Sequence, residues 1–364
     1  MANFRTIRTT SFALLATSLL LAGCSGDASK TAEAGGKTVE TSNETTMAIN
    51  AKGSSFVKPF MENVLEAYKG KSGTSINYQG GGSGAGISAL IDGTVPFACS
   101  DAPMSDEEMT EAETKLGSKA MNLPIVLGAI SIAYNAPGVT DLKMDGETLA
   151  GVFMRSITKW NDPKIAALNP GTTLPDADIR VIVRGDGSGS TYVLSDYLSA
   201  VSTEWKEKMG RSKKLNWPQG VTAMQQSDGV TKATKDTPGS ITYTEVSYAL
   251  QSGLGMAMVK NASGEFVKPE GAAVTAAAAG ASLPDDFRGS IVNSPGKGAY
   301  PISSFVFALL PTDMSKNPSG QAIVDAMNYI LTEGQMKAGE LHYAPVPESV
   351  ATKVIEQLKS IKVK

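Results

Sequence analysis

The chain has 364 residues, 41% of them hydrophobic and 19% charged, which is enough apolar material for one large domain or two of average size. The formal net charge of −3 argues against a general nucleic-acid binder, because binding to a phosphate backbone requires a basic face. The single histidine, His342, and the two cysteines, Cys24 and Cys99, exclude a histidine-rich metal site, a zinc finger and a disulfide scaffold.

Residues 1–23 have the pattern of an export signal. Arg5 and Arg8 precede the apolar stretch Phe12–Ala22, which is shorter than the ~20 residues that span a bilayer. The stretch runs into Leu21-Ala22-Gly23-Cys24, which resembles the lipobox of bacterial lipoproteins, where cleavage before the cysteine leaves it lipidated. The alternative is an ordinary signal peptide that contains a cysteine by chance.

Residues 24–46 follow as a segment in which Val39 is the only large apolar residue. Such a segment cannot bury enough surface to offset the entropy of ordering, so we expect a flexible tether from a lipidated Cys24. The folded body should begin near Met47. This arrangement places the body in the bacterial cell envelope, outside the cytoplasm, anchored by lipid in the periplasm or on the outer face of the membrane.

The body repeats one local pattern three times: a short β-like run, a turn rich in glycine and serine, and a helical pattern. This alternation predicts an α/β fold with substantially parallel sheets. The strands are expected at 47–51, 75–78 and 179–183, the turns at 53–55, 80–84 and 184–190, and the helices over 57–69, through Ile87, Leu90 and Ile91, and over 192–198.

Later segments predict further elements. The runs 129–134 and 305–310 have the pattern of strands, and the alanine-rich run 271–282 predicts a surface helix with no chemistry of its own. Two helices are expected near the C-terminus, one around 323–331 and one over 350–358.

The three turns are suited to binding an anion. Each helix start presents unpaired N–H groups and the positive end of the helix dipole, while glycine permits close approach and serine adds a hydroxyl. Arg184 stands at the mouth of the third turn, where its planar guanidinium can bind a tetrahedral oxyanion through two bonds and Asp186 can hold it in place. The alternatives are that the serines only cap helices and that Arg184 and Asp186 form a surface ion pair.

Other motifs fit less well. Gly70-Lys71-Ser72 lacks the glycine that a P-loop places five residues earlier. Gly80-x-Gly82-x-x-Ala85 matches a dinucleotide fingerprint only weakly. Around Ser188 the hydrolase pattern G-x-S-x-G is absent, because Asp186 holds the first glycine position, and a Ser-His-Asp triad would have to use the only histidine. The sequence therefore favours anion binding over hydrolysis.

Four motifs together resemble the substrate-binding proteins of high-affinity phosphate ABC importers. In chain order they are Gly53-Ser54-Ser55-Phe56, Tyr78-Gln79-Gly80-Gly81-Gly82-Ser83, Ser100-Asp101-Ala102-Pro103-Met104-Ser105-Asp106-Glu107 and Arg184-Gly185-Asp186-Gly187-Ser188-Gly189-Ser190. The resemblance implies a two-lobed periplasmic-binding-protein fold of type II (a Venus flytrap), with phosphate in the cleft and a double crossover between the lobes. Lobe I would comprise residues 47–124 and about 300–364, and lobe II about 125–299.

The same resemblance implies which residues bind phosphate, here carried over by position. They are Ser55, Phe56, Ser83, Asp101, Arg184, Ser188, Gly189 and Ser190, with Asp186 steadying Arg184. Ser55 and Ser190 stand where threonine is usual, and both keep the hydroxyl. Cys99 stands where a small residue is usual, and we expect a buried, inert thiol. Gly81 replaces a bulkier residue and should leave its loop looser.

The resemblance also implies the partners. They are inorganic phosphate, the subunits of an ABC permease with their cytoplasmic ATPase, and the membrane through the lipid on Cys24. No catalytic residue, cofactor, metal ion or nucleic acid is expected, and the protein should be a monomer that serves phosphate import during phosphate starvation.

Asp101 is an unexpected residue beside an oxyanion, because a carboxylate repels it. The position is explained if the ligand still carries a proton, since hydrogen phosphate can donate its P–OH to Asp101 whereas sulfate has no proton to give. Two alternatives stay open, namely a binding protein for another tetrahedral oxyanion such as sulfate or molybdate, and a phosphomonoesterase on the same fold.

Overall fold

The computed structural model describes residues 48–364. The signal peptide over 1–23, the lipidation site Cys24 and the tether over 24–46 lie outside the described residues. The described residues, 48–364, belong to one compact unit, which we call the body.

The first lobe of the body begins with alternating strands and helices. β1 pairs in parallel with β2 and with β3, so the carboxyl ends of these strands lie at one edge of the sheet. Helix α1 buries Phe60, Val64 and Tyr68 at helical spacing and ends at Gly73, whose φ of 75° requires glycine. The elements are β1 (Ile49–Gly53), α1 (Lys58–Ser72), β2 (Ile76–Gly80), α2 (Ser83–Ile91), β3 (Ala98–Ser100) and α3 (Asp106–Leu116).

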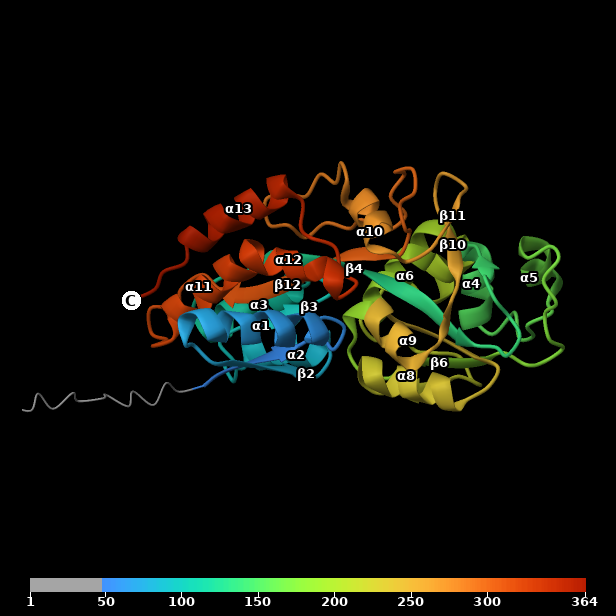
Figure 1. Ribbon diagram of the computed structural model, residues 1–364. Coiled ribbons are helices and arrows are strands. Elements are labelled where there is room, and N and C mark those ends of the chain that lie inside the picture. The colour runs from blue at the N-terminus through green and yellow to red at the C-terminus, as the bar shows by residue number, and fades with distance from the viewer. Residues whose placement is uncertain (1–47) are drawn as a thin grey trace, which may run out of the picture. The chain divides into compact units, whose positions relative to one another are not determined.

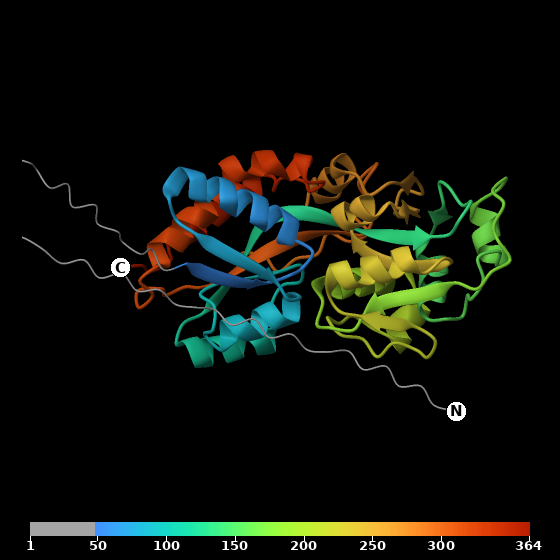
Figure 2. The ribbon, with the colours of Figure 1, turned by 60° about the horizontal axis from the view of Figure 1, so that its bottom comes forward.

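Two long strands connect the lobes (Figures 1 and 2). β4 (Ala120–Asn135) pairs antiparallel with β12 (Ser303–Pro311), and the far half of β4 continues into the second lobe, where it pairs antiparallel with β8 (Ser240–Glu245). One sheet therefore runs through the whole body in the order β2-β1-β3-β12-β4-β8-β6-β7. Residues of β4 and β12 are almost all buried, as expected for strands covered on both faces.

The second lobe surrounds β6 (Arg180–Arg184), which pairs in parallel with β7 (Thr222–Met224) and β8. Its other elements are β5 (Lys143–Met144), α4 (Gly146–Phe153), α5 (Pro163–Leu168), α6 (Gly189–Val201), α7 (Thr203–Lys208), α8 (Gln226–Asp236), α9 (Val246–Ser252), β9 (Gly255–Met256), β10 (Met258–Lys260) and β11 (Phe266–Val267).

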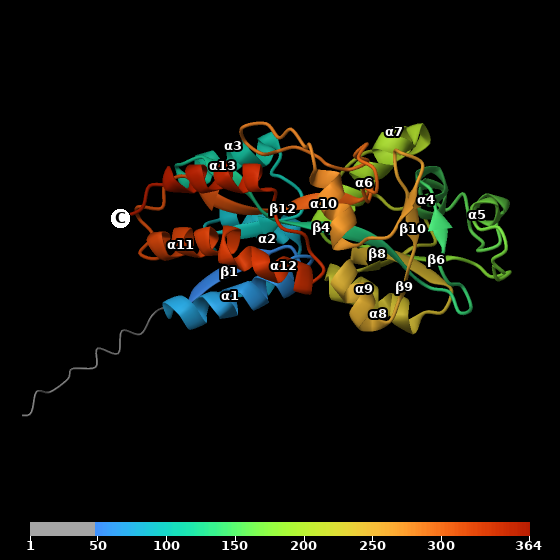
Figure 3. The ribbon, with the colours of Figure 1, turned by 45° about the horizontal axis from the view of Figure 1, so that its top comes forward.

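The C-terminal part of the chain returns to the first lobe (Figure 3). Helix α10 (Gly271–Ala278) packs on β4 and β12 at the crossing. After β12 come α11 (Gly320–Leu331), a 3-10 turn (Glu333–Gln335), α12 (Met336–Glu340) and α13 (Glu348–Lys359), of which α11 and α13 pack on each other.

Most expected elements are present, and two expectations need correction. The sheet is mixed: the parallel arrangement holds within β1–β3 and for β6 with β7 and β8. β4 and β12 pair antiparallel because β4 leads from the first lobe to the second and β12 returns in the opposite direction. The alanine-rich helix is shorter than 271–282 and is not merely superficial, since it buries Ala273, Val274, Ala277 and Ala278. The expected lobe divisions at about residues 124 and 300 fall close to these two strands and stay a prediction.

Within residues 48–364, no helix has both the length and the apolar character needed to cross a membrane.

Gly86→Ala is expected to lower the free energy of unfolding by about 1–3 kcal/mol, the usual cost of overpacking. A Cβ at Gly86 in α2 would lie 2.5 Å from Gly53 Cα and 2.9 Å from Lys52 O, and both are backbone atoms that cannot move aside. Urea unfolding measures the effect. Gly70→Ala in α1 is the control, because nothing lies within 4 Å of the added carbon; equal stability of the two variants would contradict the close packing of α2 on β1.

Candidate anion-binding site

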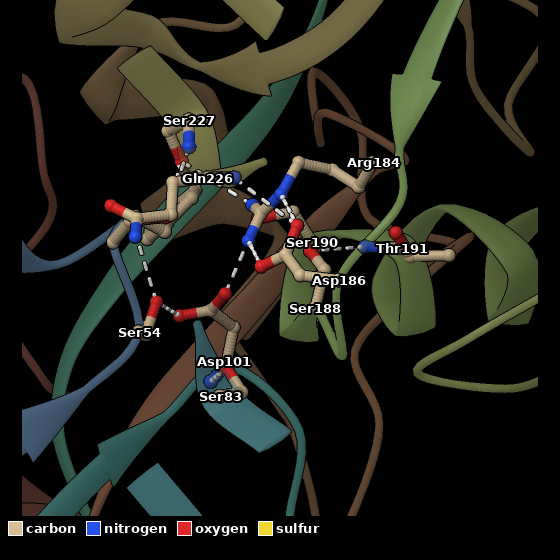
Figure 4. Close-up of polar contacts among 12 residues, drawn as sticks. Ser54, Ser83, Asp101, Arg184, Asp186, Ser188, Ser190, Thr191, Gln226 and Ser227 are labelled. Atoms are coloured by element: carbon tan, nitrogen blue, oxygen red, sulfur yellow. Dashed lines mark hydrogen bonds and ion pairs between the residues drawn. The ribbon is translucent and has the colours of Figure 1, made fainter. Parts of the chain in front are cut away.

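The polar residues singled out in the sequence meet where the strand ends of the two lobes face each other (Figure 4). From the first lobe come Ser55 and Phe56 after β1, Ser83 at the start of α2, and Asp101 after β3. From the second lobe come Arg184 at the end of β6, Asp186 in the loop, and Ser188, Gly189 and Ser190 at the start of α6. All of these except the loop carboxylate of Asp186 are buried, and Arg184 and Asp101 are only 3% and 2% exposed.

Glycines allow the two lobes to touch at the site. The N–H of Gly84 donates to the carbonyl of Gly187 across the cleft at 2.9 Å. A Cβ at Gly189 would lie 2.5 Å from Ser83 Oγ and 2.7 Å from Asp101 Cβ. A side chain at this position would hold the lobes apart, so glycine is needed here for close approach rather than for an unusual φ.

Asp101 is the buried carboxyl at the centre of the site. Ser54 Oγ donates to its Oδ1, and Ser190 Oγ donates to its Oδ2 at 3.3 Å. Burial raises the pKa of Asp101 to about 6, against the hydrogen bond from Ser54, the charge of Arg184 and the hydrogen bond from Ser190, which lower it. At neutral pH the group is therefore mostly an ionised acceptor that remains close to its titration range.

Arg184 is held in place by Asp186, as the sequence motif suggested. Its Nε donates to Asp186 Oδ1 at 2.7 Å and Nη2 donates to Oδ2, while Nη1 lies 3.5 Å from Ser227 Oγ. Burial raises the pKa of Asp186, but the bonds and charge of Arg184 outweigh it and leave the pKa below its ordinary value. Since a guanidinium has five N–H donors and these contacts use three, two remain for a ligand.

The serines at the helix starts differ in their roles. Ser188 is the N-cap of α6 and accepts the N–H of Thr191 at 3.2 Å, so the capping interpretation holds for it. Its own proton is not used in that bond and can still be donated. Ser83 likewise accepts the N–H of Asp101 at 3.3 Å and keeps its proton. Capping and anion binding are therefore compatible in the same hydroxyl.

Sequence reasoning missed two residues of this cluster. Ser54 lies within the motif Gly53-Ser54-Ser55-Phe56, but the motif alone predicts no role for it. It reaches Asp101 because it is buried between two glycine-rich strand ends. Ser227 lies in α8 and does not follow a glycine-rich turn. Its N–H donates to Ser55 Oγ at 3.0 Å. No local pattern marks it, because the contact joins residues 172 positions apart.

The remaining candidates lie elsewhere or are inert. Cys99 is fully buried, as expected, and burial raises the pKa of its thiol, which disfavours the reactive thiolate. His342 lines a separate cavity of about 530 Å³ beside α9 and the start of α10. Among residues 48–364, no cluster of three or more His, Cys, Asp or Glu side chains could hold a metal ion.

Known proteins are similar in sequence to this chain over most of its length. Residues 31–330 match the family described as a PBP superfamily domain. The phosphate-binding protein PstS of Xylella fastidiosa (strain Temecula1) is 36% identical over 308 residues, which cover 84% of this chain and 83% of that protein. The PstS proteins of Pasteurella multocida and Methanocaldococcus jannaschii are 36% and 34% identical and cover 86% and 94% of this chain, and 90% and 92% of their own length.

Solved structures share the fold. A high-affinity periplasmic phosphate-binding protein, determined with phosphate bound, superimposes with a TM-score of 0.70 at 22% identity, covering 85% of this chain and 93% of that one. A phosphate-binding protein from Stenotrophomonas maltophilia gives a TM-score of 0.66 at 17% identity, with the same coverage.

A two-lobed α/β body with a buried polar site between its lobes defines a binding protein of the PBP superfamily. At 34–36% identity over more than four fifths of its length, the chain belongs to the family of phosphate-binding proteins named PstS.

Asp101→Asn is expected to stabilise the ligand-free protein above pH 6. Because the pKa of Asp101 is raised from 3.8 to about 6 on folding, the stability associated with this group is greatest at low pH and is lost as the pH rises through about 6. The amide has no charge to bury, so the variant's gain in free energy of unfolding over the wild type should grow between pH 4 and pH 7, to at most ~3 kcal/mol. Urea unfolding across this range measures it.

Asp186→Asn serves as a control of opposite sign. Its pKa is lowered in the folded protein, so this carboxylate stabilises the fold above its ordinary pKa, and the variant should lose stability at neutral pH. Two variants that change stability in the same direction would contradict the assignment of Asp101 as an unfavourably buried charge.

Proposed function

We propose that the site binds inorganic phosphate, as hydrogen phosphate, outside the cytoplasm with high affinity and that the protein delivers it to an ABC permease for import. The observation that carries the proposal is Asp101, a buried carboxyl acceptor surrounded by donors. A site of donors alone suits any oxyanion, whereas a site that adds one acceptor suits an oxyanion that still has a proton.

The ligand contacts are proposed as follows. The two free N–H groups of Arg184 bind oxygens of phosphate, and Asp101 accepts its P–OH. The other donors are the hydroxyls of Ser55, Ser83, Ser188 and Ser190 and the backbone N–H groups of Phe56 and Gly189. Because the chain carries a net charge of −3, short local bonds rather than long-range attraction must hold the anion.

The same geometry disfavours the two alternatives. For sulfate or molybdate, Asp101 would face an unprotonated oxygen, and a buried acceptor left without a donor weakens binding strongly. A phosphomonoesterase with a histidine as its general base would need that histidine beside the site, but the only histidine, His342, lines the separate cavity beside α9. Binding without chemical change is the better supported function.

The location and the partners follow from the N-terminal sequence and from the family. The lipobox-like Leu21-Ala22-Gly23-Cys24 supports lipidation of Cys24, and residues 24–46 would tether the body to the membrane. The protein would then capture phosphate beside the permease as a monomer, which closes its two lobes, residues 47–124 with about 300–364 and about 125–299, on the ion.

Isothermal titration with phosphate and with sulfate, in wild type and Asp101→Asn at one ionic strength and pH 7.5, tests the proposal. The wild type should bind phosphate far more tightly than sulfate. In the variant the amide can turn its NH₂ toward an unprotonated oxygen, and the repulsion of sulfate is gone. We therefore expect selectivity to fall at least tenfold, or ~1.4 kcal/mol.

Arg184→Lys is the matched comparison, because an ammonium loses the two-bond geometry for both anions alike. It should weaken phosphate binding at least tenfold, ~1.4 kcal/mol, with little change in selectivity. Wild-type protein that fails to bind phosphate, or Asp101→Asn protein with unchanged selectivity, would overturn this assignment of the ligand.

Cys24→Ser is expected to leave phosphate binding unchanged and to release the protein from membranes. Serine cannot form the thioether that carries the lipid, whereas the body begins more than twenty residues later. Membrane fractionation of expressing cells after a high-salt wash measures the effect, with Cys99→Ser as the control. A Cys24→Ser protein that stays with washed membranes would disprove the lipid anchor.

A further inference from the structure

Ser54 has a more defined hydrogen-bonding arrangement than the serines that face the proposed ligand. Ser54 is only 1% exposed to solvent. Its Oγ accepts the N–H of Phe56 at 3.0 Å, and the same oxygen donates to Oδ1 of Asp101. A hydroxyl has one proton to donate, and the acceptor of this proton is the carboxyl group of Asp101, whether the N–H of Phe56 stays on Ser54 or turns to the proposed ligand.

The backbone around Ser54 fixes this geometry. The carbonyl of Ser54 accepts the hydroxyl of Tyr78 at 2.9 Å, and its N–H donates to the carbonyl of Cys99 at 2.8 Å, one residue beyond which β3 ends. Ser54 is therefore held between Tyr78 of β2 and Cys99 of β3, the strand that leads to Asp101. Its hydroxyl is already in place before a ligand binds.

Both oxygens of Asp101 consequently face hydroxyl donors, Ser54 on Oδ1 and Ser190 on Oδ2. Donors on both oxygens favour the ionised carboxylate, because a protonated carboxyl would have to turn its own proton toward a group that is already donating. Ser190 also belongs to the proposed phosphate contacts, so its proton is shared with the ligand. The Ser54 bond is the one that does not depend on the ligand.

We propose that Ser54 is a positioning residue that keeps Asp101 in its proton-accepting form and thereby sets the lowest pH at which the site rejects a fully ionised oxyanion. The inference rests on the proposed phosphate function and names the residue that controls its selectivity. Without Ser54, Asp101 takes up a proton more readily, and a protonated Asp101 can donate to sulfate as well as to phosphate.

The charged and titratable groups around Asp101 include the guanidinium of Arg184, and the titratable carboxyl groups do not compete with Asp101 between pH 5 and pH 7. Asp186 has a pKa below its ordinary value, and burial raises the pKa of Glu245, at the end of β8, to about 8. Burial also raises the pKa of the other groups that face the site, Tyr78, Cys99, Tyr343 and Tyr248, so that they remain neutral. Asp101, with a pKa of about 6, is the member of this set that titrates in that interval.

Sulfate binding as a function of pH tests the inference, because sulfate remains a dianion throughout and reports only changes in the protein. In the wild type, sulfate should bind more tightly as the pH falls through about 6, where Asp101 takes up a proton. In Ser54→Ala the midpoint of this increase should move up by about one pH unit, equivalent to a tenfold tighter hold on the proton. Titrations of sulfate from pH 5 to pH 8 measure both midpoints.

Ser304→Ala is the matched control. Ser304 Oγ donates to the backbone carbonyl of Asp101 at 3.0 Å and makes no bond to its carboxyl group, so the variant should keep the wild-type midpoint. A Ser54→Ala midpoint equal to that of Ser304→Ala would overturn the inference, as would a Ser54→Ala protein that folds but no longer binds phosphate at pH 8. Absence of phosphate binding in the wild type itself would instead overturn the proposed function.

Discussion

The site depends on one electrostatic constraint, which is that an ionised carboxylate must be kept inside the protein. Burying a charge costs more than ordinary polar contacts return unless hydrogen bonds or opposite charge compensate it. At Asp101 the compensation comes from hydroxyls of both lobes and from the charge of Arg184. Arg184 is in turn oriented by Asp186. The carboxylate is thus satisfied only when the first and second lobes meet, which links the chemistry of the site to the closed arrangement of the body.

The sheet makes this meeting possible. Parallel strands in each lobe direct their carboxyl ends, and the helix starts that follow them, to the cleft. The antiparallel strands β4 and β12 cross between the lobes and keep the two sets of strand ends opposite each other. The polar groups of the site lie on short turns, and the sheet that holds these turns contains the almost completely buried strands β4 and β12. The polar side chains of the site therefore keep a fixed geometry although they lie on turns.

The sequence was sufficient to predict what depends on neighbouring residues. The strand–turn–helix units around Ser55, Ser83 and Ser188, and the pairing of Arg184 with Asp186 two positions away, follow from local pattern and spacing. What it could not predict depends on contacts between distant segments. The antiparallel crossing strands, the bond from Ser54 to Asp101 over 47 positions and the contact of Ser227 with Ser55 over 172 positions have no local signature. The buried face of the alanine-rich helix belongs to the same class, because alanine suits both a surface and a tight interface.

The backbone contact between Gly84 and Gly187 has a consequence for the size of molecule that the protein can carry. With no side chains between these loops, the lobes stop where main chain meets main chain, and neither loop can yield as a flexible side chain would. This contact acts as a mechanical stop that fixes the width of the closed chamber. A ligand whose substituent kept the two loops farther apart would lose the bond between Gly84 and Gly187, whereas a ligand that leaves this bond intact allows the lobes to close fully.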